Sequence, residues 1–282
     1  MILQNFGYSI KIKMMTVLIF KNELSKIQKS DKIVSNCNKK KGENVIMNVG
    51  FISLGCSKNL VDTEMTIGLF RENNYKIVSN PEDADIIIIN TCGFIEPAKQ
   101  EAINTIFEMA EYKEKRCKYL IVMGCLVQRY KEELENLIPE VDLFIKYQEY
   151  DTIWEQIQNV IENVDNIDYK NIVIEDCTNF GLNVSKKYGL EFSQRVITTG
   201  QNFAYLRIAE GCSNRCTYCA IPYIRGKFVS RKIEDVLEEA EKLAKQGYKE
   251  LIVIAQDTSK YGIDIYGESK LAELLEKLSK ID

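Results

Sequence analysis

From Met47 onward, short apolar runs rich in branched residues alternate with amphipathic stretches of helical length. This alternation is typical of a parallel α/β architecture, in which each strand is followed by a helix that packs back onto the sheet. A chain of 282 residues can bury one large or two medium cores of this kind. The first part predicts strands at 49–54, 84–90, 119–123 and 143–145, and helices at 61–73, 97–112, 130–137 and 151–162.

A cysteine follows three of these expected strands almost at once: Cys56, Cys92 and Cys125. The carboxyl ends of parallel strands meet at one edge of a sheet, where ligands usually bind. We therefore expect these cysteines to converge in space. Gly55, Gly93 and Gly124 stand beside them and would let the backbone approach a bulky ligand.

The alternation of strands and helices occurs in two separate parts of the chain. Residues 163–200 lose the pattern, with only a doubtful strand at 171–174, and a second α/β pattern follows: strands at 204–208 and 250–255, helices at 233–246 and 271–280. The expected organisation is a basic extension at 1–46, a first domain at 47–163, a connection at 164–200 and a second domain at 201–282. Two βα units cannot close a barrel or bury both faces of a parallel sheet, so the second domain looks incomplete.

Residues 1–46 differ from the rest, with nine lysines, no arginine and three acidic residues. Their apolar run at 14–20 is shorter than the roughly 20 residues that span a bilayer, and no signal-peptide cleavage site follows it. We expect translation to start at Met47, a hypothesis that the codons for 41–43 test, because they can encode a ribosome-binding sequence. No membrane association is expected.

Charge and cysteine usage narrow the function further. After residue 46 the chain has 28 basic and 38 acidic residues, a net charge of −10, which argues against strong direct nucleic-acid binding. With nine cysteines and no histidine, any metal must be held mainly by thiolates. Disulfide scaffolds are usually small and loop-rich, so a reducing cytoplasm fits this chain better.

The second domain contains the motif C-x3-C-x2-C at Cys212, Cys216 and Cys219. Three thiolates at this spacing can hold a 4Fe-4S cubane and leave its fourth iron open for a cosubstrate, here S-adenosylmethionine. The alternatives are structural zinc and buried free cysteines. Zinc would need a fourth ligand, and no cysteine follows Cys219. Tyr218 could offer a surface for an adenine ring or belong to the core.

Together these motifs resemble the radical S-adenosylmethionine methylthiotransferases, which combine this motif with an N-terminal domain that carries a second three-cysteine cluster. The resemblance covers nearly all of 47–282. It rests on Gly55-Cys-Ser-Lys-Asn59, Asn90-Thr-Cys-Gly93, Gly124-Cys125 and the run from Ala204 to Arg231.

Two segments resemble the branch of that family that modifies ribosomal protein S12. They are the stretch from Gly55 to Glu64 and the stretch from Ile254 to Gly262. The second contains Gln256 and Asp257, expected near the cosubstrate, although a solvated loop aspartate is an equally adequate interpretation of Asp257. The alternative is the branch that modifies adenosine in tRNA.

The resemblance implies that a hydrogen on the β-carbon of an S12 aspartate is replaced by a methylthio group. Cys212, Cys216 and Cys219 would hold the cluster that cleaves S-adenosylmethionine, and the three cysteines of the first domain would hold an auxiliary 4Fe-4S cluster that delivers sulfur. An electron donor and a sulfur source are implied partners.

Other residues depart from the family pattern or have no assigned role. Cys37, Cys117 and Cys177 match no family cysteine and are interpreted as small hydrophobes. Arg225, Lys227 and Arg231 resemble a basic family stretch that meets a carboxylate or phosphate, with a solvated basic turn as the alternative. Residues 144–150 lack an expected glycine. Family members have a longer barrel and a further β-rich domain, so an inactive, truncated iron–sulfur fragment is a third interpretation.

Overall fold

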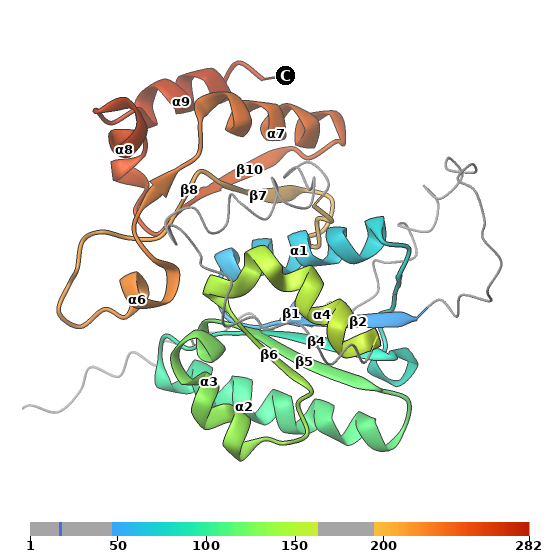
Figure 1. Cartoon of the computed structure of the whole chain (residues 1–282). Coiled ribbons are helices and arrows are strands. Elements are labelled where there is room, and N and C mark those ends of the chain that lie inside the picture. The colour runs from blue at the N-terminus through green and yellow to red at the C-terminus, as the bar shows by residue number, and fades with distance from the viewer. Residues whose placement is uncertain (1–16, 19–46, 163–194, 282) are drawn as a thin grey trace, which may run out of the picture.

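A computed structural model describes residues 17–18, 47–162 and 195–281 (Figure 1). The interpretations of Cys37, Cys177, the doubtful strand at 171–174 and most of the basic extension concern residues outside these ranges. None of the helices in the described ranges is both long and apolar enough to cross a membrane.

The first domain is built on a six-stranded sheet whose central strands run in the order β2-β4-β5-β6. These four strands are parallel, and they confirm the four strands expected from the sequence. Two short strands pair with β2: β3 is parallel to it and β1 antiparallel. The bounds are Val17–Leu18 (β1), Asn48–Ser53 (β2), Lys76–Ile77 (β3), Ile86–Thr91 (β4), Tyr119–Gly124 (β5) and Leu143–Lys146 (β6).

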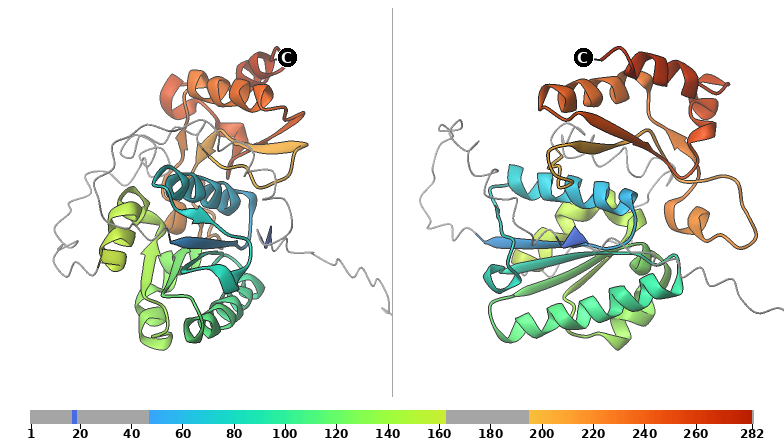
Figure 2. Two further views of the ribbon diagram at one scale, coloured as in Figure 1. Left: turned by 90° about the vertical axis from the view of Figure 1, so that its right-hand side faces the viewer. Right: turned by 180° about the vertical axis from the view of Figure 1, so that it is seen from behind.

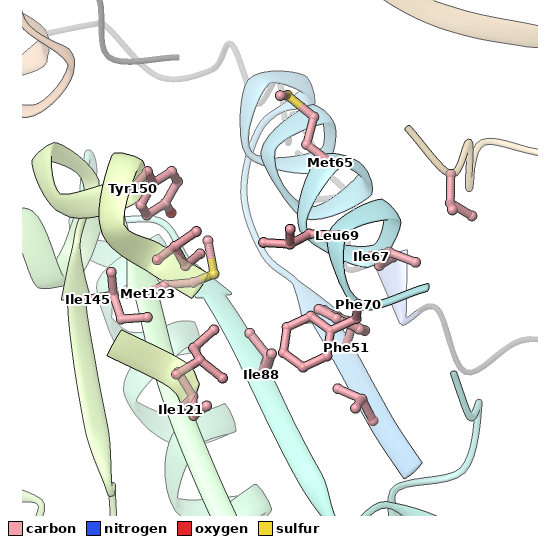
Figure 3. Packing of buried hydrophobic residues seen from close by; sticks show 14 of the residues in the cluster. Phe51, Met65, Ile67, Leu69, Phe70, Ile88, Ile121, Met123, Ile145 and Tyr150 are labelled. Carbon is pink, nitrogen blue, oxygen red and sulfur yellow. The ribbon is translucent and has the colours of Figure 1, made fainter. Parts of the chain in front are cut away.

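Helices cover both faces of this sheet, which is why its strands are apolar along their whole length. Successive side chains of a strand point to opposite faces, so Ile88 packs with helices α1 and α4 while Ile89 packs with α2 and α3. Figure 3 shows Phe51 and Ile88 of the sheet beside Phe70 of α1. The helices are Ser57–Glu72 (α1), Glu96–Ala110 (α2), Cys125–Leu137 (α3) and Ile153–Glu162 (α4), with 3-10 helices at Pro81–Asp83 (η2), Glu111–Glu114 (η3) and Tyr147–Thr152 (η4).

The second domain has a parallel pair of strands, β7 and β10, and a short antiparallel pair, β8 and β9. Both strands expected from the sequence are present, and so are both helices. The bounds are Phe203–Arg207 (β7), Ala209–Glu210 (β8), Ile221–Arg225 (α6), Val229–Ser230 (β9), Ile233–Lys245 (α7), Glu250–Ile254 (β10), Thr258–Lys260 (η8), Ile263–Tyr266 (α8) and Leu271–Leu278 (α9).

Helix α1 lies between the two domains (Figures 1 and 2). One face of the β7–β10 pair packs under α7 and α9, where Leu206 meets Ala240 and Leu274. The other face, for which the sequence offered no cover, contributes Ile254 to the same apolar cluster as α1. Every residue of α1 from Asn59 to Phe70 is buried as a result.

Candidate functional site

Cys56, Cys92 and Cys125, the first cysteine site, lie at the carboxyl edge of the main sheet. Cys56 caps the start of α1, Cys125 is the first residue of α3, and Cys92 directly follows β4. The strands turn into α1 and α3 almost without a loop, so these helices begin four and five residues earlier than expected. Asn59 of α1 links the three positions: its Oδ1 accepts from the Cys125 thiol at 3.4 Å, and its Nδ2 donates to the carbonyl of Thr91, next to Cys92, at 3.0 Å. The three cysteines therefore lie close together, as the strand order predicted.

Two glycines make this convergence possible. Gly55 has a φ of +90°, and a Cβ atom added there would lie 2.5 Å from the Cβ atom of Cys92. Gly124 has a φ of +106°, and a Cβ atom there would lie 2.3 Å from Oδ1 of Asn90. L side chains rarely adopt this backbone conformation and the space is already filled. Both positions therefore require glycine.

The three cysteines of the first site differ in how far they are exposed to solvent. Cys56 is exposed, Cys92 is half-buried and Cys125 is buried. The pKa of the Cys125 thiol is raised to about 12, mainly by burial; the Arg225 guanidinium lowers it, and the two neighbouring thiols add smaller increases. Burial likewise raises the pKa of Cys92. A metal replaces the thiol protons on binding, so these groups are suited to a cation that supplies the missing positive charge.

Cys212, Cys216 and Cys219, the second cysteine site, line a single cavity of about 730 Å³. This volume falls within the roughly 300–1,000 Å³ of typical small-molecule pockets. The loop is held by backbone hydrogen bonds: the amide of Cys212 donates to the carbonyl of Gly226 at 3.1 Å, and that of Cys219 to the carbonyl of Cys216 at 3.0 Å. Gln148 of the first domain also lines the cavity.

Neither cysteine site is arranged like a mononuclear metal centre. Across the described ranges, no group of three or more cysteine, aspartate or glutamate side chains is placed to hold a single metal ion. A zinc ion draws its sulfur ligands to about 2.3 Å and so close to one another, whereas in a cubane each thiolate binds a different iron. The thiol-only donors of both sites, and the cavity beside the second site, fit an iron–sulfur cluster.

Gln256 and Asp257 both contact the segment that carries the second cysteine site. The Gln256 amide donates to Oε1 of Glu210 at 2.5 Å. Oδ2 of Asp257 accepts a hydrogen bond of 2.9 Å from Asn214, which lies between Cys212 and Cys216. Hydrogen bonds from Ser259 first, and then from Asn214, lower the pKa of Asp257. Asp257 thus holds the cysteine loop through Asn214. The assignment of Gln256 and Asp257 to cosubstrate binding stays a prediction.

The aromatic residue expected to meet an adenine ring is placed differently. The Tyr218 side chain is 88% exposed and is not among the residues that line the cavity. Tyr223, four positions after Cys219, does line it and is 81% exposed. The assignment of Tyr218 to cosubstrate binding stays a prediction.

The basic stretch after the cysteine loop is only partly solvated. Arg225 and Arg231 are buried, so the solvated-turn interpretation is wrong for them. The carboxylates they meet belong to the chain itself: Arg225 pairs with Asp62 at 2.9 Å and Arg231 with Glu239 at 2.5 Å. Lys227 is exposed and lines the cavity.

Sequence reasoning missed the polar residues that join the two cysteine sites. These are Asn59, Asp62, Tyr147, Gln148 and Glu210. Glu210 had a signal, because it stands two residues before Cys212. The others lie on α1 and η4, and nothing local to them indicates a partner more than 60 residues away in the chain.

Cys117 is separate from both sites. It is buried, its thiol donates to the carbonyl of Tyr119 at 3.3 Å, and burial raises its pKa to about 11. This environment agrees with the interpretation of Cys117 as a small hydrophobic residue.

Two family models match the chain. Residues 48–146 match the uncharacterized protein family UPF0004 and residues 206–281 match the radical SAM superfamily. The two matches fall on the two domains, and they imply iron–sulfur clusters and S-adenosylmethionine as cofactors.

Curated relatives are similar over the same residues. The chain is 61% identical over 236 residues to the ribosomal protein uS12 methylthiotransferase RimO of Alkaliphilus oremlandii, covering 84% of this chain and 50% of that protein. It is 51% identical over 237 residues to the protein of the same name from Caldicellulosiruptor saccharolyticus, covering 84% and 51%. The chain spans about half the length of the curated relatives it matches.

Among solved structures, the radical S-adenosylmethionine methyltransferase TsrM of Kitasatospora setae aligns with a TM-score of 0.47 and 12% identity, covering 77% of this chain and 47% of that one. That similarity is too low to support an inference. The two family models and the curated relatives agree with each other, and with the cysteines that the structure brings to each domain. The chain belongs to the RimO-type radical S-adenosylmethionine methylthiotransferases.

Proposed function

We propose that this chain takes part in methylthiolation of ribosomal protein S12, with a methylthio group replacing a hydrogen on the β-carbon of an aspartate. The observation that carries the proposal is the presence of two separate three-cysteine sites joined through one buried interface. The name shared by its relatives supports S12 as the substrate. The net charge of −10 after residue 46 favours a protein substrate over tRNA.

In this proposal Cys212, Cys216 and Cys219 hold one 4Fe-4S cluster and Cys56, Cys92 and Cys125 hold an auxiliary one. When bound, the cluster at the second cysteine site would supply the electron that cleaves S-adenosylmethionine, and the auxiliary cluster would supply sulfur. A reducing cytoplasm, an electron donor and a sulfur source complete the requirements. The proposed domain limits are 47–163 and 201–282, joined by 164–200.

The residues of the chain have defined tasks around these clusters. The 730 Å³ cavity gives S-adenosylmethionine a place beside the three thiolates of the second site. Asp257 and Lys260 both hold Asn214, and this keeps the cysteine loop in one conformation. Gln256 fixes Glu210 at the start of the loop. Side chains that hydrogen bonds already hold in position need not rearrange when the cosubstrate binds, and this favours catalysis.

Anaerobic reconstitution with iron and sulfide tests the assignment. The unaltered chain is expected to bind two clusters, and Cys125→Ala and Cys219→Ala are each expected to lose half of the iron. Cys117→Ala is the matched control and should keep all of it. Equal iron in all four proteins would contradict the proposed ligands.

The products of the reaction distinguish the three candidate functions: S12 modification, tRNA modification and no activity. With reductant and S-adenosylmethionine, we expect release of 5'-deoxyadenosine and, on addition of S12, a methylthio mass increase on one aspartate. The same modification on tRNA and none on S12 would favour the tRNA branch. One bound cluster without 5'-deoxyadenosine would instead support an inert iron–sulfur fragment.

A further inference from the structure

The side chain of Arg225 crosses from the second domain into the first cysteine site. It is the last residue of α6, six positions after Cys219, and its side chain is 5% exposed. Its Nη2 atom lies 3.8 Å from Sγ of Cys125 and 2.6 Å from Oδ1 of Asn59. The segment that holds one set of cysteines thus supplies a cation to the other set.

The guanidinium of Arg225 is held in place from several sides. Nη2 also donates to Oδ2 of Asp62 at 2.9 Å, and Nη1 donates to Oε1 of Glu210 at 3.0 Å. The ring of Tyr147 packs against it, with 4.6 Å from Cζ to the ring centroid. A planar guanidinium that donates hydrogen bonds from both terminal nitrogens and stacks on an aromatic ring has little freedom to rotate. Its direction toward Cys125 is therefore fixed by the fold.

Arg207 provides an internal comparison. It binds the same two carboxylates, Asp62 at 2.5 Å and Glu210 at 3.0 Å, and is equally buried. Its other nitrogen approaches the sulfur of Met65 at 3.3 Å instead of a cysteine sulfur. The two arginines therefore share the task of joining the domains, and the contact with a cysteine of the first site distinguishes Arg225.

We propose that Arg225 is a positioning residue of the first cysteine site, which stabilises the cluster-bound sulfur of Cys125 and fixes its direction, so that the second domain completes a site in the first. This inference rests on the proposed function, because it assumes that Cys125 holds iron. A cation beside a cluster sulfur stabilises the more negative, reduced state, and hydrogen bonds to such sulfurs are a main determinant of cluster potential. Groups behind metal ligands commonly change metal affinity about 10- to 100-fold.

The test uses the full chain with Cys212, Cys216 and Cys219 changed to alanine, so that only the first site can hold a cluster. In this background, Arg225→Gln is compared with Arg207→Gln. The measurements are the rate of iron loss to a chelator and the midpoint potential from a redox titration followed by electron paramagnetic resonance. Arg225→Gln is expected to lose iron about 10- to 100-fold faster and to shift the potential to more negative values. Arg207→Gln should stay near the parent in both.

A charge-balanced variant keeps the test valid if the single substitution unfolds the chain. Asp62→Asn combined with Arg225→Gln leaves Arg207 paired with Glu210, so no buried charge is left without a partner, which is the costly outcome of a single substitution. We expect the same faster iron loss and the same negative shift in this variant.

Two results would overturn the proposal. If the Arg225 variants match the parent, or if Arg207→Gln changes iron retention and potential as much as they do, Arg225 only joins the domains. A parent chain that binds no iron would overturn the proposed function, and the role of Arg225 with it. The first result leaves the proposed function intact, so the two failures are distinguishable.

Discussion

At the scale of single residues, the first cysteine site depends on the absence of a side chain as much as on the cysteines. Gly55 lies against Cys92 and adopts a φ of +90°. Three thiolates that start from three different strands can meet only if the backbone between them is this compact. The glycine beside Cys56 is thus part of the site.

We predict that Gly55→Ala loses the auxiliary cluster while the second site keeps its own. The new Cβ atom would lie 2.5 Å from the Cβ atom of Cys92, and a non-glycine residue in this left-handed conformation costs roughly 1–2 kcal/mol more. Iron per chain after reconstitution should fall by half. Gly247→Ala is the matched control, because Gly247 has a φ of +97° and nothing within 4 Å of the new atom. Full iron in Gly55→Ala would show that the site can adjust.

At the scale of elements, α1 has an unusual environment for a helix rich in polar residues. Asp62, Thr63, Glu64 and Thr66 are all buried, although their residue types are normally exposed. Each meets a polar partner; Glu64, for example, accepts hydrogen bonds from the amide of Thr198 at 2.7 Å and from its hydroxyl at 2.9 Å. Asp62 pairs with Arg207 of the second domain, and Glu64 binds the segment directly before it, so this side of α1 is an interface.

We predict that Glu64→Ala lowers the free energy of unfolding by about 3–5 kcal/mol, because it leaves the buried Arg195, 3.3 Å away, short of a counter-charge. Burial raises the pKa of Glu64, with Arg195 and Thr198 opposing, so the carboxylate is costly to bury and the neutral Glu64→Gln should cost less than Glu64→Ala. Urea unfolding measures both. Glu72→Ala, at an exposed position of the same helix, should stay within roughly 0.5 kcal/mol of the parent. Equal effects at positions 64 and 72 would contradict the assigned interface.

At the scale of the whole molecule, the two domains share a core and buried ion pairs. Ile254 of β10 packs into the cluster that contains α1, and Arg207 pairs with Asp62 at 2.5 Å. Removal of either domain would expose the apolar side chains of this interface to water and would leave its charged side chains without their partners. The two domains are therefore coupled in folding.

We predict that the metal-free chain unfolds in one transition. The single tryptophan, Trp154, packs against Phe70 with ring centroids 5.3 Å apart and reports on the first domain only. Far-UV circular dichroism reports on the helices of both domains. In urea the two signals should have the same midpoint, as coupled domains require. A dichroism change that precedes the tryptophan change would show that the second domain unfolds by itself.

Much of this molecule followed from local sequence. The four central strands and the cysteines at their ends were predictable because apolar period and chain direction are local properties. The second cysteine site was predictable because its three cysteines lie within eight residues. The early start of α1 was not, since Cys56 is not a typical N-cap residue. The expected start of α3 at Tyr130 coincides with a kink, and a short helical stretch precedes that kink from Cys125.

Local patterns along the chain are enough to predict the parallel α/β order and the two sets of thiols. How these sets are joined depends on long-range packing: the burial of α1 between two sheets, and the contacts of Arg225 with Asp62 and Cys125. Residues 62 and 225 are 163 positions apart, and no periodicity or motif links positions so distant. Their pairing follows from how the second domain packs onto α1, a property of the folded chain as a whole.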